Sequence, residues 1–331
     1  MAQKPIVSIV MGAYNRREFL KLAIESAREE IADIPHEILV IDGGSDDGSL
    51  EWLMLQKDVV TIIQHNRGEF RGKAIMRRSW GYFMNLVFKS AQGKYILMIS
   101  DDTIFHADAV KNGLAFIEEQ EAHGKKVGAV PFYFHDVGYD EPNTYKVFTL
   151  MGKVVLNHGI YVKSAMVDID YADEDSYGFY VSDSDICFKL LKHGYEVLPC
   201  KTALMLHKQD HPVSFAMEHN DMWVRDVTAF IQKWNGVFTD STKGIEQIDF
   251  SKQTISGLAT AEYAQRFESA LALSASANDE NNPFKGDMDT KLEILEARLN
   301  SILGTMRYHV QLTQQIEKQQ TEWIRFQQNR F

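Results

Sequence analysis

The stretch Lys94-Tyr-Ile-Leu-Met-Ile-Ser-Asp-Asp-Thr103 decides the fold of this chain. Its apolar run predicts a buried strand, and two carboxylates follow that strand directly. Acidic side chains in such a place are costly unless they face a cation. Ligands of open α/β sheets lie at the carboxyl ends of the strands, so Asp101 and Asp102 are candidates for a metal site. The alternative is that they only cap a turn or the helix near Ala107.

Apolar runs of the same kind recur on both sides of this stretch, separated by segments of helical periodicity. The runs cover residues 7–11, 37–41, 59–63, 95–99 and 127–130. A stripe at i, i+3, i+4 and i+7 from Leu20 to Ala27 predicts one helix, and residues 110–123 predict another. Nearly continuous apolar strands that alternate with helices indicate a mostly parallel sheet covered on both faces, which is an α/β fold.

A second pair of carboxylates lies in Ser182-Asp183-Ser184-Asp185, at the start of a predicted helix that ends before Gly194. One pair of acids can hold a divalent cation against a diphosphate, and the other can supply a base for an attacking hydroxyl. Serine and aspartate are also good N-caps. We expect Ser184 to cap the helix and Asp183 to point into the cleft; if Asp183 only caps, Asp185 and the acids at 173–175 are the next candidates.

The composition is that of a globular protein with an acidic surface. The chain has 331 residues, 45% hydrophobic and 24% charged, with a net charge of −11. This charge argues against a nucleic-acid partner, which would require a basic surface. Cys187 and Cys200 are too few for a disulfide framework and are expected to be core thiols in a reducing compartment. Because neither a signal peptide nor a membrane span is evident, we expect a cytoplasmic protein, with peripheral membrane association left open.

The pattern divides the chain into three zones. Residues 1–238 form the predicted catalytic domain, with a donor half at 1–134 and an acceptor half at 135–238, and residues 239–287 resemble a linker. The last zone, residues 288–331, has apolar residues at alternating spacings of four and three: Met288, Leu292, Leu295, Leu299, Ile302 and Met306. This spacing predicts a coiled coil that would join copies of the chain into a homo-oligomer. A helix folded back on the catalytic domain is the alternative.

Four segments of the chain have a distinctive sequence: Val7-Ser-Ile-Val-Met-Gly-Ala-Tyr-Asn-Arg, Glu37-Ile-Leu-Val-Ile-Asp-Gly-Gly-Ser-Asp-Asp-Gly-Ser, Ala91-Gln-Gly-Lys-Tyr-Ile-Leu-Met-Ile-Ser-Asp-Asp and Tyr180-Val-Ser-Asp-Ser-Asp-Ile-Cys-Phe-Lys-Leu-Leu-Lys-His-Gly-Tyr. Together they resemble the family 2 glycosyltransferases of GT-A fold. The resemblance covers about residues 5–235. It implies a Rossmann-like GT-A sheet, a nucleotide-sugar donor and a glycan or lipid-linked glycan acceptor. It also implies a divalent metal cofactor, Mn²⁺ or Mg²⁺.

The same resemblance implies where the nucleotide binds. Gly12, Ala13 and Tyr14 would line the base, and Asp42 and Gly43 would close that pocket. Gly43 stands where some members of the family have an acid that touches the base, so that contact is in doubt here.

For the reacting groups, the resemblance implies that Asp101 approaches the ribose and that Asp102 binds the metal on the diphosphate. Asp183 falls at the position of the family's catalytic base, and His207 at that of a residue near the metal. Ser100 replaces the first acid of the usual Asp-x-Asp motif, which leaves Asp102 as the principal ligand.

A basic cluster, Arg71, Lys73, Arg77 and Arg78, stands out in this acidic chain. A solvated helix face is its ordinary explanation, but one of these side chains could contact the diphosphate, and we assign Arg78 to that role.

Together these features predict a metal-dependent, inverting glycosyltransferase of glycan or polysaccharide synthesis. Two other functions are kept open. A nucleotidyltransferase would also use a parallel sheet and a carboxylate-bound metal, but its first loop should be rich in glycine and lysine, unlike Gly12-Ala-Tyr-Asn-Arg16. A catalytically silent scaffold, assembled through the helical tail, is the other.

Overall fold

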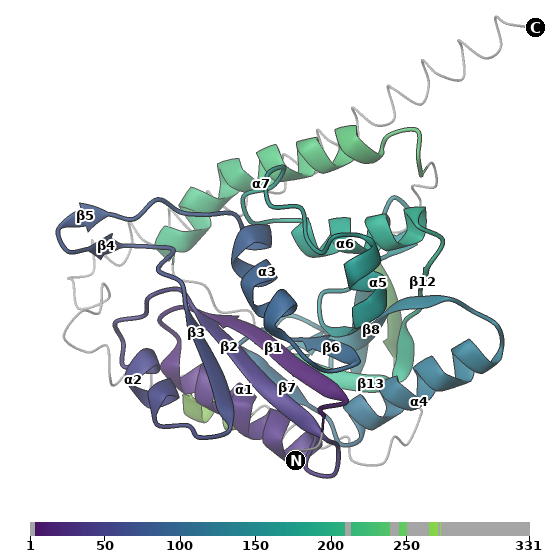
Figure 1. Cartoon of the computed structure of the whole chain (residues 1–331), viewed down its shortest axis with the longest axis horizontal. Coiled ribbons are helices and arrows are strands. Elements are labelled where there is room, and N and C mark those ends of the chain that lie inside the picture. The colour runs from purple at the N-terminus through teal and green to yellow at the C-terminus, as the bar shows by residue number, and fades with distance from the viewer. Residues whose placement is uncertain (1–3, 209–212, 239–244, 250–264, 271, 273–331) are drawn as a thin grey trace, which may run out of the picture. The chain divides into compact units, whose positions relative to one another are not determined.

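The computed structural model describes residues 4–208, 213–238, 245–249, 265–270 and 272 (Figure 1). The predicted coiled coil at 288–331 lies outside the described residues, and so does most of the predicted linker. Two compact units divide the chain, one made of residues 1–209 and 225–278 and the other of 210–224 and 279–331. The first unit contains the sheet and both predicted acidic centres, and the structural account below concerns this unit.

Strands and helices alternate through the first half of the chain as the periodicity predicts. They are β1 (Val7–Ala13), α1 (Arg17–Glu30), β2 (His36–Asp42), α2 (Ser49–Met54), β3 (Val59–Ile63), β4 (Glu69–Phe70), β5 (Lys73–Ala74), α3 (Trp80–Ser90), β6 (Tyr95–Met98), β7 (Thr103–Phe105) and α4 (Ala109–Ala122). The second half contains β8 (Val127–Asp136), β9 (Thr144–Leu150), β10 (Lys153–Val154), β11 (Gly159–Val162), α5 (Lys163–Asp168), α6 (Ser182–Lys192), β12 (Glu196–Val197), β13 (Cys200–His207), α7 (Val213–Trp234) and β14 (Ile245–Asp249).

The predicted donor half contains a parallel sheet in the order β3-β2-β1-β6, which confirms the predicted α/β fold. Val10 of β1 pairs with Leu39 of β2 on one side and with Met98 of β6 on the other. These central strands are buried on both faces, which is why their sequences are apolar almost without interruption. Their carboxyl ends lie at one edge of the sheet, where Ala13, Asp42 and the segment after Met98 meet.

The predicted acceptor half makes the sheet mixed, because β11 lies between β6 and β8 and is antiparallel to both. The strand predicted at 127–130 corresponds to β8, which is longer and which β11 separates from β6. Gly159 allows this insertion: a Cβ atom there would lie 2.2 Å from the carbonyl oxygen of Val130, and its φ of +143° suits glycine. Strand β13 then pairs parallel with β8 and antiparallel with the short β7.

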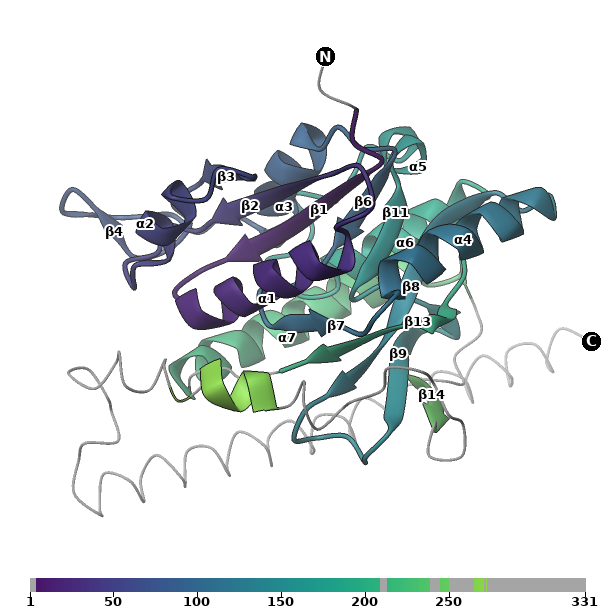
Figure 2. The same ribbon diagram turned by 90° about the horizontal axis from the view of Figure 1, so that it is seen from below.

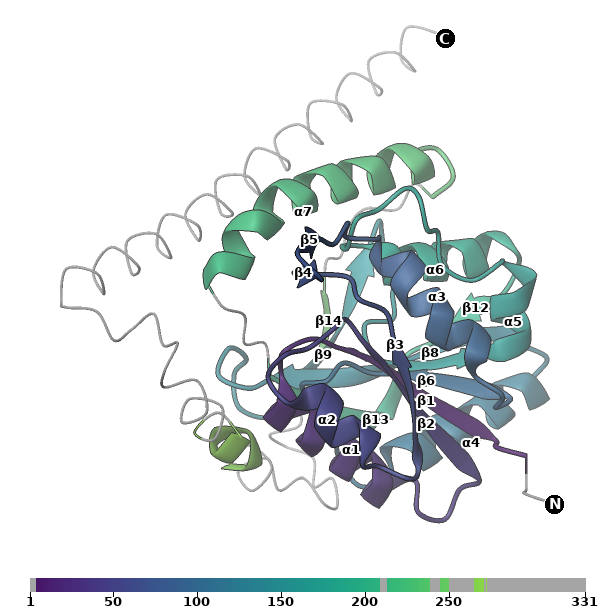
Figure 3. The ribbon, with the colours of Figure 1, turned by 60° about the vertical axis from the view of Figure 1, so that its left-hand side comes forward.

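Helices cover both faces of the sheet (Figures 2 and 3). Helices α1, α2 and α4 lie on one face, and α3, α5 and α6 lie on the other. Helix α1 buries one stripe, which includes Leu20, Ala23, Ile24 and Ala27 as the spacing predicts. Within the described residues, no helix is both long enough and apolar enough to cross a membrane. Cys187 and Cys200 are both buried free thiols.

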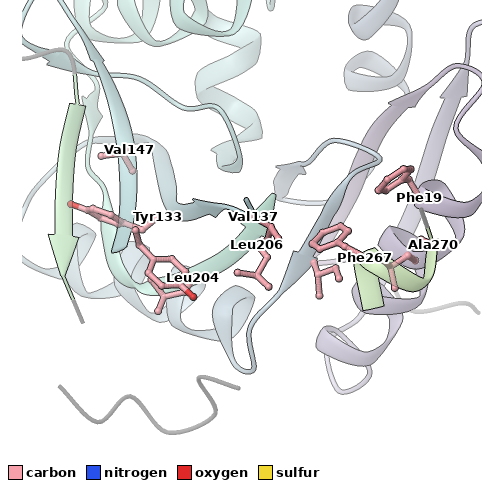
Figure 4. Close-up of a cluster of buried hydrophobic side chains, with 11 residues drawn as sticks. Phe19, Tyr133, Val137, Val147, Leu204, Leu206, Phe267 and Ala270 are labelled. Atoms are coloured by element: carbon pink, nitrogen blue, oxygen red, sulfur yellow. The ribbon is translucent and has the colours of Figure 1, made fainter. Parts of the chain in front are cut away.

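A hydrophobic cluster under β7 and β13 fixes the acceptor half against α1 (Figure 4). Leu204 and Leu206 of β13 contribute to it, and so does Phe19 of α1. Phe267, from the helical turn at 265–270, is fully buried, and its ring centroid lies 6.3 Å from that of Phe19. Strand β14 also pairs with β9. These two parts of the segment predicted to be a linker are therefore packed against the fold.

Candidate active site

The loops that follow β1 and β2 are joined by hydrogen bonds at the carboxyl edge of the sheet. The amide of Gly43 donates to the carbonyl of Ala13 at 2.9 Å, and the amide of Asn15 donates to the hydroxyl of Ser45 at 2.9 Å. The Tyr14 side chain is half-buried beside Gly43. Gly12 is also confined, since an added Cβ would lie 3.1 Å from the Phe83 ring. The structure thus brings Gly12, Ala13, Tyr14 and Gly43 together, and their contact with a base remains a prediction.

Asp42 is fully buried and binds its own turn. Its Oδ1 atom accepts hydrogen bonds from the amides of Gly44 and Ser45 at 2.8 Å each, and its Oδ2 atom accepts one from the Ser45 hydroxyl at 2.7 Å. Gly44 adopts a φ of +92°, which favours glycine in this turn. Asp42 therefore shapes the predicted base pocket through the turn that it holds.

Asp101 and Asp102 lie after β6, and Arg16 binds both of them. The Arg16 Nη1 atom lies 3.1 Å from Asp101 Oδ1 and 2.7 Å from Asp102 Oδ2, and both carboxylates are buried. Burial raises the pKa of Asp101, and the neighbouring Asp102 raises it further. Burial also opposes ionisation of Asp102, but Arg16 and His207 together hold the pKa of Asp102 well below its ordinary value. Asp102 is therefore the ionised member of the pair.

His207 reaches Asp102 because β13 pairs with both β7 and β8. In that pairing His207 is opposite Thr103 of β7 and opposite Asp136 of β8. Its Nε2 atom lies 3.3 Å from Asp102 Oδ1, and its Nδ1 atom lies 2.5 Å from Asp136 Oδ1. Burial disfavours the imidazolium, but the two carboxylates outweigh it and raise the pKa of His207 to about 9.

Ser100 occupies the position of the missing first acid and orients Asp102 instead. Its hydroxyl donates to Asp102 Oδ1 at 2.5 Å and lies 2.9 Å from the Nε2 atom of His158. Burial lowers the pKa of His158 to about 3, so this ring is neutral. We infer that its Nε2–H group donates to Ser100, because the Ser100 proton is used on Asp102. The chain of bonds from His158 through Ser100 fixes one oxygen of Asp102.

Asp183 lies in the first turn of α6, and the prediction that Ser184 caps this helix is wrong. The helix begins at Ser182, one residue after Val181, which has a φ of +55°; Ser184 is already helical and caps nothing. The Oδ1 atom of Asp183 accepts a hydrogen bond from the Ser184 amide at 2.7 Å. Burial raises the pKa of Asp183 to about 6, although the bonds from Ser184 oppose this. A carboxylate with that pKa is a suitable base near neutral pH.

Two of the four acids considered as substitutes for Asp183, namely Asp185 and Asp173, are engaged elsewhere. Asp185 is fully buried and accepts hydrogen bonds from the Tyr177 hydroxyl and the Trp234 indole, each at 2.8 Å. Lys233 contacts both Asp185 and Asp173, at 2.9 Å and 2.8 Å. These bonds hold the end of α7 against α6 and its preceding loop. Asp183 is therefore the better candidate for a base.

Asp226, on α7, holds the loop that leads into α6. Its carboxylate accepts hydrogen bonds from the backbone amides of residues 178–180 at 2.8 to 3.0 Å, and its side chain is fully buried. The other side of this loop packs on α3: the Trp80 amide donates to the carbonyl of Gly178, and Gly81 leaves room for the Asp173 carbonyl. Sequence reasoning did not single out Asp226, because its role depends on a contact 46 to 48 residues away along the chain.

A short segment connects the two acidic centres. His158 touches Ser100, next to Asp102, while the amide of Leu156 donates to the Cys187 thiol at 3.2 Å, one helical turn after Asp183. Residues 156–158 thus contact both the carboxyl end of β6 and the first turns of α6. Arg78 lies apart from these contacts, on the segment before α3, with its guanidinium 5.3 Å from the Tyr82 ring centroid.

Two residues at the first centre, Asp102 and His207, could hold a divalent cation together with the phosphates of a ligand. Asp102 would supply a carboxylate, and His207 would supply an imidazole that Asp136 orients, as carboxylates commonly orient metal-binding histidines through the other ring nitrogen. His207 would have to release a proton to bind a metal. No group of three or more histidine, cysteine or acidic side chains that could hold an ion occurs in the described part of the chain. Mg²⁺ is commonly held by one or two carboxylates together with substrate phosphates, so Asp102 is the protein ligand that it would prefer here.

Three residues at this centre were not predicted: Arg16, Asp136 and His158. Arg16 follows the first strand within the quoted Val7–Arg16 motif, and a cation there could have been paired with the acids after the strand at 95–98. Asp136 is the last residue of the apolar strand β8, and Asp102 follows the apolar strand β6 closely, so the two acids carry a comparable signal. His158 carries no comparable signal, because its role depends on the antiparallel insertion of β11.

Comparisons with known proteins agree with this architecture. The family model described as glycosyl transferase family 2 matches residues 8–166. An uncharacterized glycosyltransferase of Rickettsia felis is 35% identical over 114 residues, which is 34% of this chain and 17% of the relative. A Bacillus subtilis glycosyltransferase, TuaG, provisionally assigned to teichuronic acid biosynthesis, is 25% identical over 123 residues, covering 35% of this chain and 44% of TuaG. The chain therefore spans less than half the length of these two curated relatives.

A solved structure extends the similarity in fold to most of the chain. The mannosyltransferase PcManGT of Pyrobaculum calidifontis, in complex with GDP-Man and Mn²⁺, superposes with a TM-score of 0.51. The two share 14% sequence identity, over 91% of this chain and 81% of the other. At that identity the similarity is one of fold.

Proposed function

We propose, from the premise that residues 8–166 form a family 2 glycosyltransferase domain, that this protein transfers a sugar from a nucleotide-diphosphate donor to an acceptor hydroxyl. The observation that supports this most directly is that residues 156–158 contact both the segment of Asp102 and the first turns of α6, which carry Asp183. Asp102 is held ionised by Arg16 and His207, whereas Asp183 has a pKa raised to about 6. One is suited to a cationic, diphosphate-binding centre and the other to proton transfer.

In the proposed reaction, the acceptor oxygen attacks the anomeric carbon while its proton passes to the carboxylate of Asp183. The bond from the anomeric carbon to the diphosphate breaks in the same step, and the nucleoside diphosphate leaves with its electron pair. A single displacement without an enzyme nucleophile inverts the anomeric configuration. The α6 turn fixes one oxygen of Asp183 on the Ser184 amide, and we propose that the other faces the acceptor.

The nucleoside diphosphate would bind where the loops after β1, β2 and β6 meet. Gly12, Ala13, Tyr14 and Gly43 would line the base, and Asp101 would approach the ribose. Asp102 and His207 would hold Mn²⁺ or Mg²⁺, which when bound neutralises charge on the departing diphosphate. Arg16 already supplies positive charge at the same place.

The acceptor is proposed to be a glycan or a lipid-linked glycan, because a relative of this chain is assigned to polysaccharide synthesis. The predicted cytoplasmic location and the self-association through residues 288–331 also remain proposals. Neither affects the assignment of the reacting groups.

A panel of nucleotide sugars tests the proposed function. Purified protein is incubated with each donor and Mn²⁺, and release of nucleoside diphosphate is measured with and without added glycan. We expect one donor to be used well above the others, with Asp183→Asn protein as the matched control for chemistry. Absence of diphosphate release from every donor, in protein that still binds a nucleoside diphosphate, would count against the transferase.

A further inference from the structure

The most basic segment of this acidic chain runs from Arg67 to Arg78, between β3 and α3. It contains five basic residues and one acidic residue, whereas the whole chain has a net charge of −11. Strands β4 and β5 make a small hairpin in this segment, which stands away from the main sheet (Figure 1). Arg71 and Lys73 are exposed at its turn. Such a local reversal of charge creates a field that attracts anions.

Aromatic contacts fix where this basic segment lies. The Arg67 guanidinium is 5.1 Å from the centroid of the Tyr14 ring, at the proposed donor pocket. The Arg77 guanidinium is 5.6 Å from the centroid of the Phe179 ring, in the loop that leads to Asp183. Burial raises the pKa of Tyr180, and the positive charges of Arg77 and Arg67 oppose this effect. The segment therefore extends from the donor side of the site to the acceptor side.

Asn66 holds the base of the segment in place. Its side-chain oxygen accepts a hydrogen bond from the backbone N–H group of Arg78 at 2.6 Å, and its backbone N–H group donates to the Gly43 carbonyl at 2.9 Å. The Ile75 amide donates to the Gly68 carbonyl at 2.9 Å, which closes the hairpin. These bonds fix the backbone of the segment, and the Arg77 side chain lies beside Phe179.

We propose that Arg71, Lys73 and Arg77, together with Phe179 and Tyr180, bind a negatively charged glycan as the acceptor. The guanidinium of arginine presents paired N–H donors that match carboxylate and phosphate groups, and an aromatic face beside it offers an apolar surface to a sugar ring. A chain of net negative charge would otherwise repel such an acceptor. This inference rests on the proposed function and specifies its acceptor class.

Two alternatives give these basic side chains a different ligand. If the arginines served the donor, they would bind the nucleoside diphosphate. A membrane surface would require the basic groups to face outward together, whereas Arg67 and Arg77 turn toward Tyr14 and Phe179.

Binding measurements separate these possibilities. Oligogalacturonate, a glycerol phosphate oligomer and a neutral maltooligosaccharide of similar length serve as glycan probes, and GDP and UDP probe the donor site. The variant is Arg71→Gln/Arg77→Gln. Lys111→Gln, an exposed lysine of α4, is the matched control for loss of positive charge.

We expect the wild-type protein to bind at least one anionic oligomer more tightly than the neutral one. The double variant should weaken that binding roughly 10-fold or more, because two charge-assisted contacts are lost. The double variant should bind GDP and UDP as tightly as the wild type does. The Lys111→Gln variant should bind every probe as tightly as the wild type does. Carboxylate and phosphate oligomers distinguish the two sources of negative charge.

Three results would overturn the inference. They are equal affinity for anionic and neutral oligomers, loss of nucleotide binding in the double variant, and binding of the wild type to phosphatidylglycerol vesicles without binding to either anionic oligomer. Failure of the transferase itself is distinguishable, because the protein would then bind the anionic oligomer without releasing nucleoside diphosphate from any donor.

Discussion

Replacing Asp226 tests how the loop before the proposed base is held. The Asp226 carboxylate accepts backbone hydrogen bonds from three consecutive residues, Gly178, Phe179 and Tyr180. In Asp226→Ala these amides lose their acceptor, and each unsatisfied, partly buried N–H group costs about 1 to 3 kcal/mol. Because this loop is only partly buried, we take the lower part of that range and expect unfolding free energy to fall by about 3 to 5 kcal/mol. Loss of the exposed partner Arg225 adds little.

The Asp226→Asn variant removes the negative charge at this position while keeping a side chain of the same shape. The asparagine keeps one carbonyl oxygen in place, so we expect a loss of about 1 to 2 kcal/mol, and the folded protein should still bind nucleoside diphosphate. Transfer should nevertheless slow, because residues 178–180 lead to Asp183 through Val181, whose φ of +55° is tolerated only while the loop is fixed. Asp226 is thus a positioning residue rather than a catalytic one.

Urea unfolding at pH 7 measures the first effect, and turnover at saturating donor measures the second. Asp33→Asn, an exposed acid between α1 and β2, is the control for loss of a carboxylate. An Asp226→Ala protein whose stability lies within about 0.5 kcal/mol of the wild type would refute the calculation, since that is the ordinary spread of surface substitutions. Transfer by Asp226→Asn at the wild-type rate would refute the positioning role.

The remaining predictions concern the proposed chemistry and the tail. Asp102→Ala should abolish metal-dependent turnover while Asp101→Ala mainly weakens donor binding; undiminished turnover in excess chelator would contradict the metal-assisted reaction. Asp183 acts only when unprotonated, so kcat/KM should rise with pH and level off above about 6, falling about 10-fold per pH unit below it. Asp183→Asn should remove that dependence and lower transfer roughly 10²-fold or more, and a near wild-type rate would reject the base. Deleting residues 287–331 should convert an oligomer into an active monomer in mass measurements; a full-length protein already monomeric at micromolar concentration would exclude assembly through the tail.

The alternation of apolar strands and amphipathic helices was enough to predict the α/β fold. Strand β6 and the acids that follow it are a local pattern, because burial on both faces requires an apolar run and ligands bind at its end. The strands at 7–11 and 37–41 were also predicted from their apolar runs, and loops after parallel strands lie at the carboxyl edge of the sheet. The assignment of Gly12 and Gly43 to a nucleotide pocket came from the resemblance to the family 2 glycosyltransferases, because a glycine-rich turn alone carries little information.

The environment of the acids, in contrast, depends on contacts between distant segments. Asp102 and His207 are 105 residues apart and meet because β13 inserts between β7 and β8. No pattern in the sequence near 159–162 distinguished β11 as the antiparallel strand that brings His158 to Ser100.

The first turn of α6 shows both what local sequence can predict and what only tertiary contacts decide. Ser182, Asp183 and Ser184 are all good N-caps by residue type, so sequence alone could not place the first helical residue. The tertiary structure decided it, because Asp226 draws residues 178–180 to α7 and the chain enters the helix through Val181. Local sequence determined which elements form and where acids end them, since hydrophobic periodicity acts over a few residues. Only strand pairing and buried polar contacts over long separations decided which of those acids is ionised, oriented or available as a base.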